Sequence, residues 1–367
     1  MASVVAAVIP APRSPVELRE IPEPELEVDS ALLDVEFSEV CGTDLYLQQG
    51  RLEGVPYPLI PGHVSVGRLG KIRGRISDVE GRPFAEGDLI TFLDVHATCN
   101  ECWYCLVARA TTRCPHRKVY GITYGLADGL CGGWAQKVYI RPGTKCIRLD
   151  GVDPLRFMAG GCALPTALHA VERAEVSIGD TVLVLGSGPV GLSCVIFALM
   201  RGALKVLCVG APENRLAAAR LVGAADTLNI ETCAEPEARR RWVLENTRGR
   251  GADITIEATG SPAAVTQAMR YTRDAGRVVI VGQYTDHGEV AFNPHQDLNR
   301  KHLDVRGCWG SDFSHFYRGA QIMADDGRSQ SWSRLKLAHY SLARAGDALR
   351  DVETGHAVKA LIAPQKL

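Results

Sequence analysis

The stretch Thr181-Val-Leu-Val-Leu-Gly-Ser-Gly-Pro-Val-Gly-Leu192 decides the fold of this chain. An apolar strand runs into a Gly-x-Gly-x-x-Gly turn, and a helical segment follows. In such a turn the first glycine permits the tight bend, the second lets the backbone approach a pyrophosphate, and the third allows close helix–strand packing. The order of strand, turn, helix and second strand predicts dinucleotide binding rather than a merely structural turn. The residues predicted to bind here are Gly186, Gly188, Pro189, Val190 and Gly191.

Strand and helix patterns alternate around this turn, which predicts a doubly wound parallel sheet over residues 154–296. The strand candidates are Thr181–Leu185, Lys205–Val209, Ile254–Glu257 and Arg277–Val281. The helical candidates are Val190–Met200, Arg215–Val222 and Pro262–Tyr271.

Outside this region the sequence pattern is typical of short strands and turns. Residues 1–153 are punctuated by glycine and proline, which predicts a β-rich first domain. Residues 297–367 contain too little for a sheet of their own, so we expect them to return to that first domain. Their elements are predicted at Asp304–Gly307, Tyr317–Asp325, Leu342–Gly355 and Val358–Ala363.

Composition narrows the class of protein. A chain of 367 residues predicts two domains. With 46% apolar and 23% charged residues and a net charge of −1, the chain is expected to be globular, with no basic surface for nucleic acid and no membrane patch. No apolar run approaches the ~18 residues that span a bilayer. The N-terminal stretch lacks the features of a signal peptide, so we expect a reducing, cytoplasmic location.

Four of the twelve cysteines lie in one short segment with the pattern Cys-x-x-Cys-x-x-Cys-x8-Cys. This spacing predicts one loop folded around a tetrahedral structural zinc ion, because four thiolates close the coordination shell. The alternatives are a set of free thiols and a site that has lost its zinc. The predicted ligands, within a lobe over residues 96–116, are Cys99, Cys102, Cys105 and Cys114.

Further motifs complete a family pattern along essentially the whole chain. In order and spacing, the chain resembles the zinc-dependent medium-chain dehydrogenases/reductases of the alcohol, polyol and threonine dehydrogenase type. The motifs are Cys41-Gly-Thr-Asp44, Gly62-His63, the four-cysteine lobe, Gly132-Gly-Trp-Ala135, the Gly186 turn, Ile256-Glu-Ala-Thr-Gly260 and Gly307-x-x-Gly310. The resemblance implies a GroES-like catalytic domain beside a Rossmann nucleotide-binding domain.

The resemblance also implies site residues. Cys41, His63 and Cys162 match the three ligands of a catalytic zinc, which gives two zinc ions per chain. Thr43 matches the hydroxyl residue that hydrogen-bonds the zinc-bound oxygen, and we expect it to accept the substrate proton. Asp44 matches the carboxylate that orients the histidine. Thr259 and Gly282 match positions that line the cofactor. The activity implied is hydride transfer between a nicotinamide cofactor and an alcohol or ketone.

Three positions depart from the family pattern. Val64 stands where a glutamate usually follows the histidine, and that glutamate often sits behind the metal. The last gap in the cysteine lobe has one residue more than usual. Tyr46 occupies a position that is often a proton-relaying histidine, so it either passes a proton or lines the pocket.

The cofactor is predicted from the end of the second strand. The carboxylate that grips the adenosine ribose is expected about 20 residues after the glycines, but Gly210 stands there. Without that carboxylate a 2′-phosphate is not repelled, and Arg215 can pair with it, which favours NADP. The alternative is that Glu213 turns back to the ribose and NAD is used.

The substrate is less well defined by the residues. The Cys-Gly-Thr-Asp motif resembles the polyol and threonine dehydrogenase branch, which favours a secondary, polyol or cyclic alcohol. Asp94 and His96 either bind such a substrate, face solvent or support the lobe. The rival functions are a zinc-free quinone or enoyl reductase and a non-catalytic NADP-binding protein. Residues 289–293 and Asp304–Gly307 resemble the edge at which nucleotide domains of the family pair, which predicts a homodimer or homotetramer.

Overall fold

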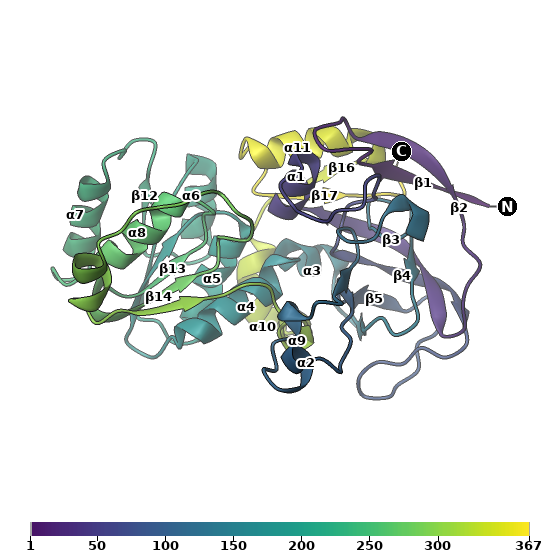
Figure 1. The fold of residues 1–367 in the computed structure, drawn as a ribbon, viewed down its shortest axis with the longest axis horizontal. Coiled ribbons are helices and arrows are strands. Elements are labelled where there is room, and N and C mark those ends of the chain that lie inside the picture. The colour runs from purple at the N-terminus through teal and green to yellow at the C-terminus, as the bar shows by residue number, and fades with distance from the viewer. Residues whose placement is uncertain (1, 367) are drawn as a thin grey trace. The chain divides into compact units, whose positions relative to one another are not determined.

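The computed structural model describes residues 2–366, and this part of the chain forms two compact units (Figure 1). The β-rich unit contains the chain up to Cys162, the segment Asp312–Ser329 and the chain from Lys336 onward. The parallel-sheet unit contains Ala163–Ser311 and Gln330–Leu335. Among residues 2–366, no helix combines the length and the apolar character that crossing a membrane requires.

A seven-stranded sheet is the centre of the β-rich unit. Its strand order is β16-β17-β3-β4-β5-β9, and β8 also pairs with β3. All of these pairs are antiparallel except the parallel pair β16 and β17. The strands are β3 (Ser30–Val40), β4 (Ser65–Arg73), β5 (Leu89–Phe92), β8 (Lys137–Ile140), β9 (Cys146–Arg148), β16 (Leu337–Tyr340) and β17 (Lys359–Ile362).

The long strand β3 separates two hydrophobic cores. Successive side chains of a strand point to opposite faces. Leu32 and Val40 therefore pack into one core, and Leu33 and Val35 pack into the other. Burial on both faces holds β3 rigidly, so its C-terminal end is a well-fixed point in the unit.

Smaller elements surround this sheet. Two short sheets are formed by β1 (Ser3–Val8) with β2 (Glu17–Pro22), and by β6 (Val95–Ala97) with β7 (Lys118–Val119). The helices are α1 (Gly42–Gln49), α2 (Trp103–Leu106), α3 (Pro154–Gly160), α9 (Phe313–Ala324) and α11 (Ala345–Glu353), with short 3₁₀ turns at Thr111–Arg113, Leu126–Asp128 and Leu342–Arg344. Helix α10 (Asp326–Ser333) spans the chain boundary between the two units.

The parallel-sheet unit has six parallel strands in the order β12-β11-β10-β13-β14-β15. This is the doubly wound order 3-2-1-4-5-6, in which ligands bind outside the carboxyl ends of the strands. The strands are β10 (Thr181–Leu185), β11 (Lys205–Gly210), β12 (Asp226–Asn229), β13 (Ala252–Glu257), β14 (Thr272–Ile280) and β15 (Asp304–Gly307). The helices are α4 (Ala163–Ala174), α5 (Pro189–Met200), α6 (Glu213–Leu221), α7 (Pro236–Asn246) and α8 (Pro262–Tyr271), with a π-helical turn at Pro294–Asn299.

The predicted doubly wound sheet and β-rich domain are confirmed, and the final strand returns to the β-rich unit by pairing with β3. The boundaries differ from those predicted. The first lies after Cys162 instead of residue 153, because α3 packs against β3 and β4. The second lies after Ser311 instead of residue 296, because β15 pairs with β14 and so extends the parallel sheet.

The Gly132-Gly-Trp-Ala135 motif supports the loop that carries His63. A Cβ on Gly132 would lie 1.9 Å from the carbonyl oxygen of Ile60, and Gly133 N–H donates to the carbonyl of Gly62 at 2.7 Å. We expect Gly132→Ala to lower stability by about 1–3 kcal/mol through overpacking against backbone, measured by thermal and urea unfolding.

Gly346→Ala is the matched control, because its Cβ meets nothing within 4 Å and it lies in α11 of the same unit. This control should be as stable as the wild type or slightly more stable. Equal stability of the Gly132→Ala variant and the control would contradict the expectation.

Candidate active site and metal-binding clusters

Three segments of the β-rich unit bring Cys41, His63 and Cys162 together. Cys41 directly follows β3 and is the N-cap of α1, His63 lies just before β4, and Cys162 follows α3. Their candidate ligand atoms all lie within 4.8 Å of one another, and Cys41 Sγ is 3.8 Å from His63 Nε2. Cys41 and His63 are buried, and Cys162 is half-buried. The structure therefore assembles the three residues that the sequence predicts as one metal site.

The donor set fits zinc. Zinc binds sulfur at about 2.3 Å and nitrogen at about 2.0–2.1 Å, which separates neighbouring ligand atoms of a tetrahedron by roughly 3.5–3.8 Å. The cysteines are free thiols, so both sulfur atoms are available as ligands. Three protein donors leave the fourth position of a tetrahedral ion open, as catalytic zinc sites require.

Charges within this cluster are strongly coupled. A hydrogen bond from Cys162, together with the neighbouring His63, holds the pKa of the Cys41 thiol well below its ordinary value despite burial. The pKa of Cys162 lies well above its ordinary value because of that hydrogen bond and of burial. Burial alone would lower the pKa of His63, but the Cys41 thiolate and the Asp44 carboxylate raise it to about 10. The cluster thus favours a Cys41 thiolate beside a positively charged His63 ring.

Asp44 ties two of the ligand segments together. Its carboxylate accepts the N–H of Cys41 at 2.9 Å and the N–H of Gly62 at 3.3 Å, and the side chain is fully buried. Burial raises the pKa of Asp44 well above its ordinary value. Among the described residues, His63 Nδ1 has no hydrogen-bond partner. The predicted hydrogen bond from Asp44 to the histidine ring is therefore replaced here by bonds to backbone on either side of the site.

Thr43 and Tyr46 lie on α1, directly after Cys41. Both side chains are half-buried. The backbone N–H of Thr43 points at the Cys41 sulfur and helps to lower its pKa. The roles of the two hydroxyl groups, proton acceptor and relay or pocket lining, remain predictions.

Glu39 and Lys359 form a buried ion pair beside this cluster that the sequence analysis missed. Burial would lower the pKa of Lys359, but the Glu39 carboxylate raises it above its ordinary value. The sequence carried only a weak signal: Glu39 is an acidic residue two positions before Cys41, but Asp34 and Glu36 are acidic in the same strand.

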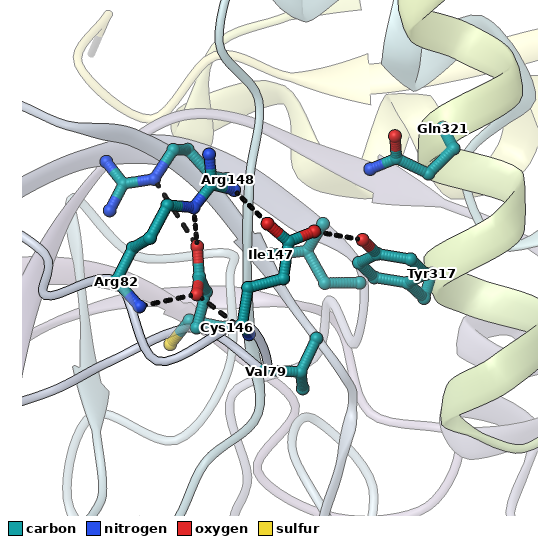
Figure 2. Close-up of a pocket in the computed structure, with 9 residues that line it drawn as sticks. Val79, Arg82, Cys146, Ile147, Arg148, Tyr317 and Gln321 are labelled. Atoms are coloured by element: carbon teal, nitrogen blue, oxygen red, sulfur yellow. Dashed lines mark hydrogen bonds and ion pairs between the residues drawn. The ribbon is translucent and has the colours of Figure 1, made fainter.

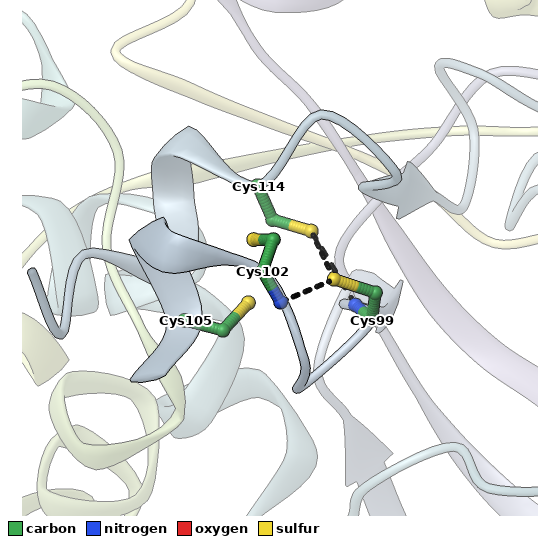
Figure 3. A group of neighbouring side chains, drawn as sticks. All are labelled: Cys99, Cys102, Cys105 and Cys114. Atoms are coloured by element: carbon green, nitrogen blue, oxygen red, sulfur yellow. Dashed lines mark hydrogen bonds between the residues drawn. The ribbon is translucent and has the colours of Figure 1, made fainter. Parts of the chain in front are cut away.

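The four-cysteine lobe converges as predicted (Figure 3). The four sulfur atoms all lie within 4.8 Å of one another, so the extra residue in the last gap is absorbed by the loop. Backbone N–H groups of Cys99 and Cys102 each point at a neighbouring sulfur at 3.3 Å. Such donors, the backbone N–H of Glu101 first among them, lower the pKa of Cys99 to about 6, whereas desolvation raises the pKa of Cys105 to about 12. The donor set fits a closed structural zinc site.

His96 supports the fold beside this lobe. Its Nδ1 lies 2.5 Å from the Tyr124 hydroxyl and its Nε2 lies 3.0 Å from the carbonyl oxygen of Pro142. Burial lowers the pKa of His96 below its ordinary value. Since both ring nitrogens are engaged within the β-rich unit, the supporting role is favoured over substrate binding for this residue.

The glycine-rich turn follows β10 in the parallel-sheet unit. Gly186 has a φ of +109°, and a Cβ on Gly191 would lie 1.9 Å from the Gly186 carbonyl oxygen, so neither position accepts a side chain. A Cβ on Gly188 would meet nothing within 4 Å, which leaves room for a ligand against the backbone. These three positions have the properties that a pyrophosphate-binding turn needs.

Glu257 organises the neighbouring loops at the carboxyl end of β13. Its buried carboxylate accepts the N–H and the hydroxyl of Thr259 at 2.7 and 2.6 Å, and the N–H of Gly282 at 3.3 Å. The side chain of Glu257 thus holds both predicted cofactor residues, Thr259 and Gly282. From the sequence, Glu257 was known only as part of a motif.

The residues at the end of β11 and the start of α6 are those that could contact the adenosine ribose of a bound cofactor. A Cβ on Gly210 would lie 2.4 Å from Ser187 Oγ, so this position has no space for a carboxylate in the present backbone. Glu213 is exposed and pairs with Arg220. Arg215 is half-buried, and burial lowers the pKa of its guanidinium.

A pocket elsewhere in the β-rich unit is polar and internally paired (Figure 2). The Tyr317 hydroxyl donates to Glu80 at 2.9 Å, Arg82 pairs with Asp78 at 2.9 Å, and Arg148 lies 3.7 Å from Asp78. These contacts join the loop before β5 to α9. The pocket shares no residue with either metal-binding cluster.

Comparison with known proteins agrees with this arrangement. Residues 27–151 match the alcohol dehydrogenase GroES-like domain, and residues 189–325 match the zinc-binding dehydrogenase domain. The chain is 31% identical over 350 residues to 5-exo-hydroxycamphor dehydrogenase of Pseudomonas putida, covering 95% of each chain.

Two solved structures are similar over nearly the whole chain. An alcohol dehydrogenase of Thermotoga maritima has a TM-score of 0.92 at 31% identity, covering 99% of this chain and 100% of that one. A zinc-binding dehydrogenase of Sinorhizobium meliloti 1021 bound to NADP has a TM-score of 0.84 at 26% identity, with the same coverage. With its ligand clusters, its GroES-like unit and its doubly wound sheet, the chain belongs to the zinc-dependent medium-chain dehydrogenases/reductases and is an enzyme of their alcohol dehydrogenase type.

Proposed function

We propose that this enzyme binds two zinc ions per chain and transfers hydride between NADP and a secondary, polyol or cyclic alcohol or its ketone. The convergence of Cys41, His63 and Cys162 carries the proposal, because it provides an open three-ligand site. A zinc-free quinone or enoyl reductase does not need these three residues, so this rival is disfavoured.

Each candidate site residue of the β-rich unit has a separate role in the proposed reaction. A zinc ion held by Cys41, His63 and Cys162 would supply Lewis acidity toward the substrate oxygen. Thr43, on the first turn of α1, is the proposed acceptor for the proton of the substrate hydroxyl. Asp44 keeps Cys41 and the His63 loop in register through its two backbone hydrogen bonds.

Cofactor choice is proposed from the end of β11. A ribose-binding carboxylate at position 210 would repel a 2′-phosphate. Gly210 carries no such group, and the contact with Ser187 leaves no space for a carboxylate side chain there. The nearest acidic residue, Glu213, is bound to Arg220. Arg215 remains as the proposed partner of the phosphate, because a guanidinium and a phosphate form strong charge-assisted hydrogen bonds. The structurally similar S. meliloti protein is bound to NADP.

The substrate class is proposed from likeness and motif together. The P. putida relative is named for hydroxycamphor, whose hydroxyl group is on a ring. The Cys-Gly-Thr-Asp motif adds the resemblance to polyol dehydrogenases. A panel of ring alcohols, linear secondary alcohols, polyols and primary alcohols, followed by nicotinamide absorbance, tests this ordering.

Assembly and location complete the proposal. β15 is the edge strand of the parallel sheet, and an edge strand needs a partner or protection. We propose two-fold pairing at this edge, giving a homodimer or homotetramer; residues 289–293, part of the predicted interface, are not in a strand. The free thiols and the thiolate clusters suit the reducing cytoplasm.

Zinc content is the first test. Protein purified without chelator should contain about two zinc ions per chain by elemental analysis. Cys41→Ala should lose about one zinc and essentially all activity while keeping its fold, because catalytic ligation is local. Cys102→Ala should lower the melting temperature, since structural zinc binding contributes directly to folding. Full activity of Cys41→Ala would refute the proposed site.

Cofactor preference is the second test. Arg215→Ala should weaken NADPH binding about 10- to 100-fold, as expected from losing about 1.5–3 kcal/mol of charged hydrogen bonding. NADH binding should change little, and both are measured by fluorescence titration. The control is Arg240→Ala on α7, whose side chain is 42% exposed and pairs with Glu237. If the wild type prefers NADH and Arg215→Ala leaves both affinities unchanged, the assignment of NADP is wrong.

Assembly is the third test. Sedimentation at micromolar concentration should give the mass of at least two chains, because pairing covers the β15 edge. A mass equal to one chain across this range would contradict pairing at that edge.

A further inference from the structure

A fully buried ion pair lies directly beside Cys162 in the β-rich unit. Glu39 on β3 is 1% exposed, and Lys359 on β17 is 2% exposed. Lys359 Nζ donates to Glu39 Oε1. Removing two charges from water is expensive, and such a pair is weak evidence for stability. The contacts of the pair therefore indicate what it does for the unit.

Both members of the pair form hydrogen bonds with the backbone around Cys162, the third candidate zinc ligand. Glu39 Oε2 accepts the backbone N–H of Cys162 at 2.7 Å, and Oε1 lies 3.2 Å from the Cys162 sulfur. Lys359 Nζ donates to the carbonyl oxygen of Gly160 at 3.2 Å. The carboxylate and the ammonium thus fix the backbone on both sides of Gly161.

Gly161 makes this close approach possible. Its φ is +51°, and a Cβ there would lie 2.0 Å from Glu39 Oε2 and 2.7 Å from Lys359 Nζ. A side chain would therefore displace the ion pair from the backbone of Cys162.

The carboxylate is also fixed relative to the other two ligands. Glu39 lies on β3, two residues before Cys41, which directly follows that strand. Its N–H donates to the carbonyl of Val64 at 3.0 Å, directly after His63, and its carbonyl oxygen accepts the indole N–H of Trp134 at 3.0 Å. Glu39 is thus connected through backbone to Cys41 and His63, and through its side chain to Cys162.

We propose that Glu39 is a positioning residue for the zinc ligand Cys162, that Lys359 anchors it, and that the pair determines how firmly the catalytic zinc is retained. This rests on the proposed two-zinc enzyme. The hydrogen bond to the N–H of Cys162 holds its sulfur toward Cys41 and His63. The Lys359 ammonium offsets the carboxylate charge, so that an acceptor can lie close to the sulfur ligands.

Zinc loss and cobalt substitution test this role. Partners behind metal ligands typically change metal affinity about 10- to 100-fold. In the presence of excess chelator, Glu39→Gln and the neutral double variant Glu39→Gln/Lys359→Met should release one zinc per chain at least about tenfold faster than the wild type. After cobalt(II) exchange, their visible absorption bands should shift, because the geometry around the Cys162 sulfur changes.

Arg148→Met is the matched control. It breaks another ion pair of the β-rich unit, 2.6 Å from Asp88, and touches no metal ligand. It should lower the melting temperature while leaving zinc release and the cobalt spectrum unchanged.

The outcomes separate the inference from the proposed function. If the wild type holds only one zinc, or Cys41→Ala holds as many as the wild type, the proposed function fails. If the wild type holds both ions and the Glu39 variants release zinc at the wild-type rate with unchanged cobalt spectra, the inference alone is overturned. If the single variant does not fold, the double variant decides, because it leaves no charge unpaired. Failure of both to fold would also overturn the inference, since the pair would then serve the fold instead of the metal.

Discussion

The carboxylate of Asp44 accepts one hydrogen bond from the backbone of Cys41 and another from the backbone of Gly62. These two bonds join the end of β3 to the loop that carries His63, although the two segments are separate in the chain. Because the carboxylate is buried, no water competes for these bonds. The spacing of two candidate metal ligands therefore depends on one side chain, and the rest of the candidate site is built around that spacing.

The same segments are held from outside by small residues. Gly132 and Gly133 lie so close to the Ile60–Gly62 backbone and to Ser65 that any side chain would force them apart. Gly161 allows the Glu39–Lys359 pair to reach the backbone beside Cys162. In each case the glycine matters for the contact it permits, because a metal site needs its ligands fixed to within a fraction of an ångström.

In the parallel-sheet unit, a buried carboxylate likewise fixes backbone at the carboxyl ends of the strands, where the cofactor is expected to bind. Glu257 at the end of β13 collects the N–H groups of Thr259, Gly260 and Gly282 on one buried carboxylate. The loops after two neighbouring strands are therefore fixed beside the glycine-rich turn. In both units an acidic side chain that is inaccessible to solvent organises backbone and leaves the surface of the site to other residues.

The sequence by itself determined the periodic and closely spaced features. The alternation after Thr181 fixed the parallel sheet, and the four-cysteine spacing fixed the lobe, because both depend on local geometry and short loops. The motifs also identified Cys41, His63 and Cys162, but through resemblance, since residues so far apart have no spacing rule. Only the tertiary structure placed Asp44 on backbone amides, engaged both nitrogens of His96 and paired Glu39 with Lys359. These contacts join distant strands and loops, and no local pattern in the chain encodes which buried charge meets which partner.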